Sequence, residues 1–335
     1  MPESSAKRPG KRPTLTDVAH TAGVSVALAS IVMRDAEGAS DKSRERVKRA
    51  AAELGYRPDS RARSLRSHRN RTLGVTLYLG EPLHAELADA LYAAADEAGY
   101  ELVLGATGAH RNELRALDTL ADAGTEAIIA ISSNLSSAAL AQVAEQVPVV
   151  SMLRQVRDIT SILTDEAAGI EALVDHLIQR GHRRLLHLDG GSAVSAAQRR
   201  TAFKHTVART EGRVTGAVLA AGPDETAAFD AMNAYLEHED APTRATAVLA
   251  FNDRAALGAL RAIDQAGLRV PEEMAVTGFD DSEFARLAHV DLTSVRQDVG
   301  ALATAALAAA TTASRDGSEH APRLVIRGST TPTTP

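Results

Sequence analysis

The sequence has no cysteine and no long apolar run, and each of these absences excludes a class of protein. Without cysteine among its 335 residues, the chain forms neither a disulfide framework nor a thiolate metal site. No apolar run reaches the roughly 18 residues of a membrane-spanning helix. The basic start, MPESSAKRPGKRP, lacks the apolar segment of a signal peptide. We therefore expect a soluble, cytoplasmic protein without a membrane partner.

Charge is distributed unevenly along the chain. The first 71 residues contain 4 Lys and 12 Arg against 8 acidic residues, whereas the whole chain has a net charge of −6. A basic segment followed by an acidic body is the pattern expected when one end of a protein contacts nucleic acid. A solvated basic surface is the alternative.

Residues 14–34, TLTDVAHTAGVSVALASIVMR, have the pattern of two short helices joined by a turn. Thr14 and Asp17 fit a capping box at the start of the first helix. Gly23 can adopt the positive φ of a sharp turn, and Ser25 is a suitable N-cap for the second helix. This arrangement is typical of the motif that places its second helix in the DNA major groove, although any small helical hairpin shows the same pattern.

Two basic segments follow. A third helix is expected over SDKSRERVKRAAAELGY, ending at Gly55. Residues 59–67, DSRARSLRS, then predict one short helix with three arginines and a single bulky apolar side chain, Leu65. A helix this short is unstable in water unless something holds it. A basic segment with one apolar wedge fits insertion into the DNA minor groove, and a plain linker is the alternative.

From Leu73 onward, short apolar runs alternate with amphipathic helices. We predict strands at 73–79, 101–104, 127–131, 148–151, 162–164, 185–188, 217–219, 247–251 and 275–278, and helices that include 85–98, 167–180, 196–210 and 254–266. This alternation predicts an α/β fold with parallel sheets. Nine strands are too many for one small sheet, so we expect two doubly wound lobes with a crossing near residues 160–166.

An ordered set of motifs spans about residues 14 to 331, namely TLTDVAHTAGVS, ELGYRPD, ARSLRS, LGVTL, ALVDHLIQRGHRRLLHL, AFNDRAALGALRAIDQAGLRVPEEMAVTGFDD and LTSVRQD. Together they resemble the LacI/GalR family of bacterial transcriptional regulators. The resemblance implies a disordered basic arm (1–13), a helix-turn-helix head (14–57), a hinge helix and linker (58–71), and a periplasmic-binding-protein-like body (72–335). The two lobes of that body would comprise about 72–162 with 296–323, and 163–295 with 324–335.

The resemblance also implies which residues contact ligands. A homodimer would bind a pseudo-palindromic double-stranded DNA operator through Thr14, Ser25, Val26, Ala27, Ser30, Ile31 and Arg34 of the head and Arg61, Ala62 and Leu65 of the hinge. A small effector between the lobes would contact Leu83, His84, Arg199, Asn252 and Asp280, with Asp165 a weaker match. Asp, Asn and Arg side chains after apolar strands suit a hydroxyl-rich ligand, such as a sugar or a related metabolite.

Two departures from the family pattern bear on specificity. Several relatives have polar side chains where this chain has Val26, Ala27 and Ile31, and apolar side chains can contact only thymine methyl groups. We therefore expect base recognition to depend on Arg34, the basic arm and hinge-induced DNA deformation. Residues 81–84, EPLH, replace a frequent Asn-Pro-Phe-Phe; with 3% aromatic residues, strong stacking on a ligand is not expected.

Each proposed effector contact has a structural alternative. Asn252 and Asp280 could cap the helices that follow them, and a lone residue such as His84 is more often a surface histidine. No GxGxxG, Walker or GxSxG motif accompanies the Asp280-Asp281 pair, so we expect no enzymatic activity, cofactor or metal site. The sequence therefore predicts an effector-controlled transcriptional regulator, more specifically a repressor, with a solute-binding protein as the alternative class.

Overall fold

The computed structural model describes residues 13–33, 36–56, 70–240, 242–312 and 316–331. The chain divides into two compact units, Met1–Asn70 and Arg71–Pro335. Most of the predicted basic arm and the predicted hinge helix, with Arg34, Arg61, Ala62 and Leu65, lie outside the described residues.

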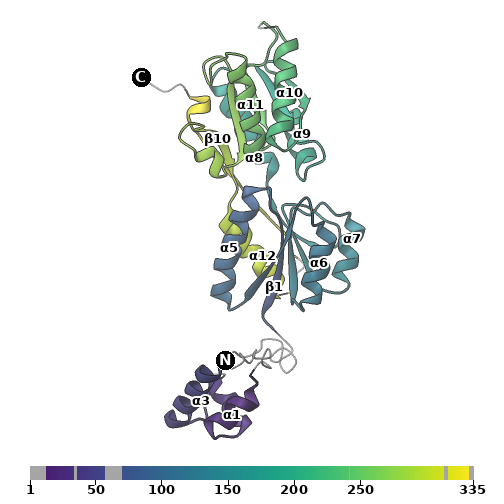
Figure 1. Cartoon of the computed structure of the whole chain (residues 1–335). Helices are drawn as coiled ribbons and strands as arrows, with labels where there is room; N and C mark the ends of the chain where they lie inside the picture. Colours follow the sequence, from purple (N-terminus) through teal and green to yellow (C-terminus); the bar gives the residue numbers. More distant parts are fainter. Residues whose placement is uncertain (1–12, 34–35, 57–69, 241, 313–315, 332–335) are drawn as a thin grey trace, which may run out of the picture. The chain divides into compact units, whose positions relative to one another are not determined.

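Three helices form the described part of the first unit (Figure 1): α1 (Leu15–Ala22), α2 (Val26–Met33) and α3 (Asp41–Leu54). The predicted capping box is confirmed, because the Thr14 N–H donates to Asp17 Oδ2 over 2.7 Å while the Asp17 N–H donates to Thr14 Oγ1. Gly23 ends α1 with φ 60°, the left-handed conformation expected of glycine there. Small apolar side chains fill the core between the helices: Val18, Ala19, Ala22, Ala29, Val32, Val47, Ala50 and Ala51.

The second unit contains two six-stranded sheets, and every strand pair of the first sheet is parallel. The first sheet has the order β11-β5-β4-β3-β1-β2. Its elements are β1 (Thr72–Tyr78), α5 (Pro82–Ala98), β2 (Glu101–Thr107), α6 (Glu113–Asp122), β3 (Ala127–Ile131), α7 (Ser137–Ala144), β4 (Val149–Met152), β5 (Thr160–Thr164), α12 (Val299–Thr312) and β11 (Ser318–His320). Helices α5 and α12 cover one face, and α6 and α7 cover the other (Figure 1). All five residues of β3 are therefore buried.

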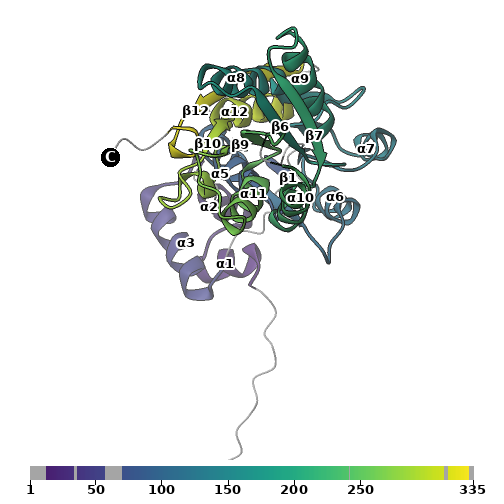
Figure 2. The same cartoon turned by 90° about the horizontal axis from the view of Figure 1, so that it is seen from above.

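The second sheet has the order β12-β10-β9-β8-β6-β7, with only β12 antiparallel to its neighbour. Its elements are α8 (Glu166–Gln179), β6 (Arg184–Asp189), α9 (Ala196–Ala208), β7 (Thr215–Ala220), α10 (Glu225–His238), β8 (Ala247–Ala250), α11 (Asp253–Gln265), β9 (Ala275–Asp280), β10 (Thr293–Arg296) and β12 (Arg323–Val325), with 3-10 turns at Glu283–Arg286 and Gly328–Thr330. Helices α8 and α9 lie on one face, and α10 and α11 on the other (Figure 2).

The predicted α/β fold with two doubly wound lobes is confirmed. All nine predicted strands are present, and β10, β11 and β12 are three further strands among the described residues. The chain passes between the sheets after β5, after β10 and between β11 and β12. In open α/β sheets, ligands bind beyond the carboxyl ends of the strands. The first two crossings leave from such strand ends, those of β5 and β10, so polar residues that follow these strands lie where the two lobes meet.

Candidate functional site

The exposed surface of α2 is the candidate DNA-contacting surface of the first unit. Helices α1 and α2 meet at 105°, the geometry of a helix-turn-helix. The Ser25 hydroxyl accepts the Leu28 N–H over 3.2 Å, so Ser25 caps α2 as predicted. Arg46 of α3 donates to the carbonyls of Ala22 and Gly23 and thereby fixes the turn between the helices.

The predicted contact residues of α2 divide between its exposed and buried sides. Val26 is 45% exposed and Ala27 is also exposed, whereas Ser30 and Ile31 are half-buried. Ala29 and Val32 face the core. An exposed valine at the start of α2 suits contact with a thymine methyl group, and its role in base recognition stays a prediction.

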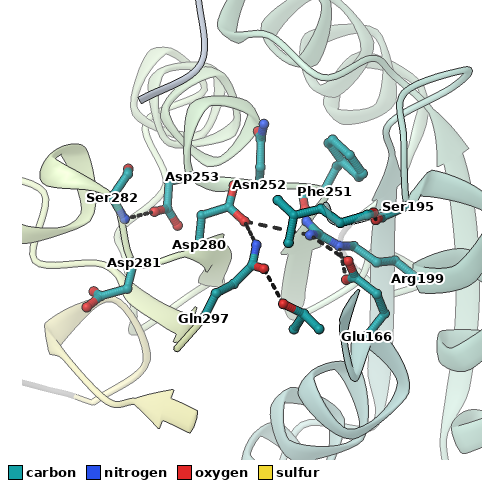
Figure 3. Close-up of polar contacts among 12 residues, drawn as sticks. Glu166, Ser195, Arg199, Phe251, Asn252, Asp253, Asp280, Asp281, Ser282 and Gln297 are labelled. Carbon is teal, nitrogen blue, oxygen red and sulfur yellow. Dashed lines mark hydrogen bonds and ion pairs between the residues drawn. The ribbon is translucent and has the colours of Figure 1, made fainter. Parts of the chain in front are cut away.

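Arg199 is the centre of a buried polar cluster in the second lobe (Figure 3). Arg199 lies on α9, and the residue is 4% exposed. Nε donates to Glu166 Oε2 over 2.6 Å, and Nη1 donates to the Phe251 carbonyl over 2.6 Å. The guanidinium also lies 3.6 Å from the centroid of the Phe279 ring, a cation–π geometry. Although burial alone would lower the pKa of Arg199, the carboxylates around it raise that pKa above its usual value.

Asp280 joins Arg199 to the crossings between the lobes. Its Oδ1 lies 3.6 Å from Arg199 Nη2 and accepts a hydrogen bond from Gln297 Nε2 over 2.8 Å. Gln297 in turn accepts from the Thr164 hydroxyl. Thr164 ends β5 of the first sheet, and Gln297 directly follows β10 of the second. One chain of polar contacts therefore connects the cluster to two of the three crossings (Figure 3).

Three carboxyl groups in this region have raised pKa values, those of the half-buried Glu81 and of the buried Asp253 and Asp280. Burial, and then the nearby Asp280 charge, raises the pKa of Glu81 to about 8. The same two causes raise the pKa of Asp253 to about 8, although Asp253 also accepts hydrogen bonds from the Ser294 hydroxyl and the Ser282 N–H. Burial raises the pKa of Asp280 to about 6, with Arg199 and Gln297 opposing the shift. Perturbed acids gathered between two lobes are typical of a functional site.

Asp165 and Asn252 cap helices, which is the structural alternative considered for such residues. Asp165 Oδ1 accepts the Ala168 N–H over 2.9 Å at the start of α8, and Asn252 Oδ1 accepts the Ala255 N–H over 2.8 Å at the start of α11. Asp280 instead ends β9. The cap bonds hold Asp165 and Asn252 beside the cluster, and their contact with an effector stays a prediction.

Leu83 and His84 lie in the interior of the first lobe. Leu83, near the start of α5, is 3% exposed and packs in the core that α5 and α12 form with the first sheet. His84 is 5% exposed, and its Nδ1 accepts the Tyr78 N–H over 3.0 Å. Burial lowers the pKa of His84 to about 4, so the imidazole is neutral at neutral pH. The structure does not bring these two residues together with Arg199, and their predicted effector contacts remain predictions.

Direct contacts between the lobes surround the cluster. Arg254 Nη1 of α11 donates to the Gly80 carbonyl over 2.9 Å, directly beside Glu81. Arg286 and Glu86 form an ion pair of 2.7 Å between the second and first lobes. Such contacts change whenever the lobes move relative to each other, so they are suited to report effector binding.

Sequence reasoning missed Glu166, Gln297 and Glu81 as members of the site. Glu166 directly follows Asp165 after a strand, which is a local signal for the carboxyl edge of a sheet. Gln297 gives no such signal, because its role depends on two sequence-distant partners, Thr164 and Asp280. Glu81 was noted only as a departure from a family pattern.

The described residues contain no group of three His, Cys, Asp or Glu side chains placed to hold a metal ion. In the same part of the chain, no single helix is long and apolar enough to cross a membrane. Helices α1 and α2 reach the length and apolar composition of a membrane span only when they are taken together, across their 105° bend.

A helix-turn-helix unit joined to a two-lobed body with a polar cluster at the lobe crossings defines a ligand-controlled DNA-binding protein. Residues 14–59 match the model of the bacterial regulatory proteins of the lacI family, and residues 174–330 match the periplasmic binding protein-like domain. The transcriptional regulator GalR of Salmonella typhimurium is 30% identical over 301 residues, covering 88% of this chain and 87% of GalR.

Two solved structures show the same relationship. A LacI transcriptional regulator from a Rhodococcus species is 34% identical with a TM-score of 0.74, covering 78% of this chain and 98% of that one. The lac repressor dimer bound to operator and the anti-inducer ONPF is 28% identical with a TM-score of 0.83, covering 96% of this chain and 99% of that one. The chain belongs to the lacI family of bacterial regulatory proteins, which are DNA-binding transcriptional regulators. The predictions of family, fold class and regulator function are confirmed.

Proposed function

We propose that the chain is a homodimeric repressor whose affinity for a pseudo-palindromic operator is set by a small effector between the lobes. The connection from Arg199 through Asp280 and Gln297 to Thr164 is the observation that carries this proposal. A ligand that competes for Arg199 or Asp280 changes contacts at two crossings, and so changes the relative free energies of lobe arrangements. The similarity to a dimeric, operator-bound repressor with an anti-inducer supports the same reading.

The proposed coupling runs through the segment 58–71, which we assign as hinge helix and linker. Paired hinges of a twofold dimer would insert Leu65 at the operator centre, because a symmetric protein matches a symmetric site. Coupling between effector and DNA sites is typically about 1 to 3 kcal/mol, a change in operator affinity of about 5- to 150-fold. Since the target is the chromosomal duplex, we place this activity in the cytoplasm and assign no enzymatic step to the protein.

The proposal is tested by selecting duplexes from a random pool with the full-length protein and measuring affinity for the selected and a scrambled sequence by fluorescence anisotropy. We expect a selected sequence with twofold symmetry. Leu65→Ala should weaken binding to it more than to scrambled DNA, and Arg34→Ala should reduce sequence preference more than Ile31→Ala. Equal loss on both duplexes contradicts the wedge, and absence of any duplex binding at low salt favours the solute-binding alternative.

A further inference from the structure

Strand β7 is an open edge of the second sheet, beside β6 (Figure 2). Among the described residues it pairs only with β6, in parallel and over six residues. Thr215, Gly216, Ala217 and Ala220 are exposed, so the strand is accessible from its free side. The edge of a sheet is where a second chain can add a strand.

This edge differs from the other three edges of the described sheets, because it has no charged residue. Strands β11 and β12 are three residues long and contain Glu319 and Arg323, and β2 begins with Glu101. Short strands and charged side chains protect sheet edges from pairing with other chains. The six residues of β7, TGAVLA, provide neither protection. An edge that stays unprotected while the others are protected is expected to have a partner.

The backbone groups that β7 offers to a partner come from alternate residues. Thr215 and Ala221, six residues apart, both donate their N–H groups to carbonyls on the β6 side. Bonded and outward-pointing residues alternate along a strand in a parallel pair. Gly216, Val218 and Ala220 therefore direct their N–H and carbonyl groups away from β6.

These outward groups fit a second copy of the same strand. If two β7 strands run antiparallel with Val218 at the twofold axis, Gly216 of each copy lies opposite Ala220 of the other. The three outward residues of each strand then form about six backbone hydrogen bonds with the other strand. Between them, Ala217 of each copy faces Leu219 of the other. Every facing pair is small or apolar, so no like charges meet across the contact.

The residues that flank β7 have opposite charges at its two ends. In the same register, exposed Arg213 of one copy lies opposite Pro223 of the other, next to Asp224. Both charged side chains are held in place, because Arg213 Nε donates to the Thr210 carbonyl over 3.1 Å and Asp224 Oδ1 accepts the Ala227 N–H over 3.0 Å. Twofold symmetry repeats the contact between opposite charges at both ends of the strand pair.

We propose that β7 pairs antiparallel with β7 of a second copy and thereby joins two operator-binding dimers into a tetramer. The DNA-binding head joins the body at Arg71, directly before β1 of the first lobe, whereas β7 belongs to the second lobe. We therefore assign β7 to the contact between dimers. A tetramer of this kind has two pairs of heads and can hold two operators at once. The tetramer rests on the proposed dimeric function, whereas the β7 pairing itself does not.

Sedimentation velocity of the full-length protein tests the assembly. Ala217→Lys places a charge on the free edge without removing a backbone group, and Ala197→Lys places the same charge on an exposed position of α9 as the matched control. Val218→Pro removes an N–H that points outward and leaves the bonds to β6 intact. We expect four chains for the unsubstituted protein and Ala197→Lys. Two chains are expected for Ala217→Lys and Val218→Pro, with the dissociation constant of the tetramer raised about 10-fold or more.

Cross-linking tests the register of the pairing. The chain contains no cysteine, so Val218→Cys introduces a single thiol. At the twofold axis this thiol faces its own copy with a Cα separation of about 5.5 Å, which a disulfide can bridge. Ala220→Cys on the same strand is the control, because its own copy lies about 14 Å further along the pair. Under mild oxidation we expect Val218→Cys to form cross-linked pairs at least about 10-fold faster than Ala220→Cys.

Three outcomes overturn the inference. One is an unsubstituted protein that never exceeds two chains at concentrations up to about 100 μM. Another is a tetramer that Ala217→Lys leaves intact, and this variant decides the matter if Val218→Pro does not fold. The third is equal cross-linking of the two cysteine variants. Affinity for a single operator duplex should be the same for Ala217→Lys and the unsubstituted protein, so failure of both to bind duplex contradicts the proposed function and not the β7 pairing.

Discussion

Replacing Arg199 by methionine should destabilise the protein strongly. The change removes the cation between Glu166 and Asp280, whose side chains are 11% and 7% exposed, and leaves both carboxylates in the interior. Breaking a buried ion pair by removing one partner costs about 3 to 5 kcal/mol. At about 2 to 4 °C per kcal/mol for a body of this size, the midpoint should fall by about 6 to 20 °C.

The matched control is the neighbouring residue on the same helix. Arg200 pairs with Asp189 over 2.6 Å, but its side chain is 33% exposed, so Arg200→Met should cost about 1 kcal/mol or less. Adding Glu166→Gln to Arg199→Met should recover part of the loss, because one uncompensated charge disappears. The loss should also be smaller in mild acid, since protons then neutralise the remaining carboxylates.

Urea unfolding of the full-length variants, followed by far-ultraviolet circular dichroism, measures these differences. The chain contains no tryptophan, so dichroism is preferable to intrinsic fluorescence. The reasoning fails if Arg199→Met costs no more than Arg200→Met, because the cluster would then be solvated rather than buried.

Three further predictions concern other parts of the chain. Thr14→Ala removes the α1 cap and should cost about 1 kcal/mol, seen as about fivefold faster hydrogen exchange of α1 amides; unchanged exchange contradicts it. Gly258→Ala places a Cβ 2.2 Å from the Glu225 carbonyl and should lower the free energy of unfolding, measured in urea, by about 1 to 3 kcal/mol, whereas Gly300→Ala, 3.8 Å from its nearest neighbour, should not. The contribution of Glu81 to stability should fall as pH rises from about 5 to 8, because the folded state keeps a proton on Glu81 that the unfolded chain releases; the pH slope of stability in Glu81→Gln should differ from that of the unsubstituted protein by up to about 1.4 kcal/mol per pH unit, and identical slopes contradict it.

Features that depend on residues close together in the sequence could be predicted from the sequence. The capping box at Thr14, the turn at Gly23 and the buried strand β3 all depend on patterns within a few residues. Strands β10, β11 and β12 were not predicted, because they are short and include polar residues such as those of SEH and RLV. Their strand conformation depends on sheet edges that other segments provide.

The candidate site was predicted only in part, for a related reason. Residue type and position after a strand indicated Arg199 and Asp280, which the structure places together. Sequence alone could not show that His84 points inward to the Tyr78 N–H, since burial depends on how α5 packs on the sheet.

The chain passes between the two lobes three times, and this affects how the protein folds during synthesis on the ribosome. The first lobe begins at β1 yet needs α12 to cover α5 and β11 to complete its edge, and both come from the last 37 residues. While the second lobe is being translated, the face that Leu302 and Ala306 will cover stays open and the β5 edge stays unpaired. Neither half of the body is thus a contiguous folding unit, and a nascent chain stopped before Val299 should need a chaperone to remain in solution.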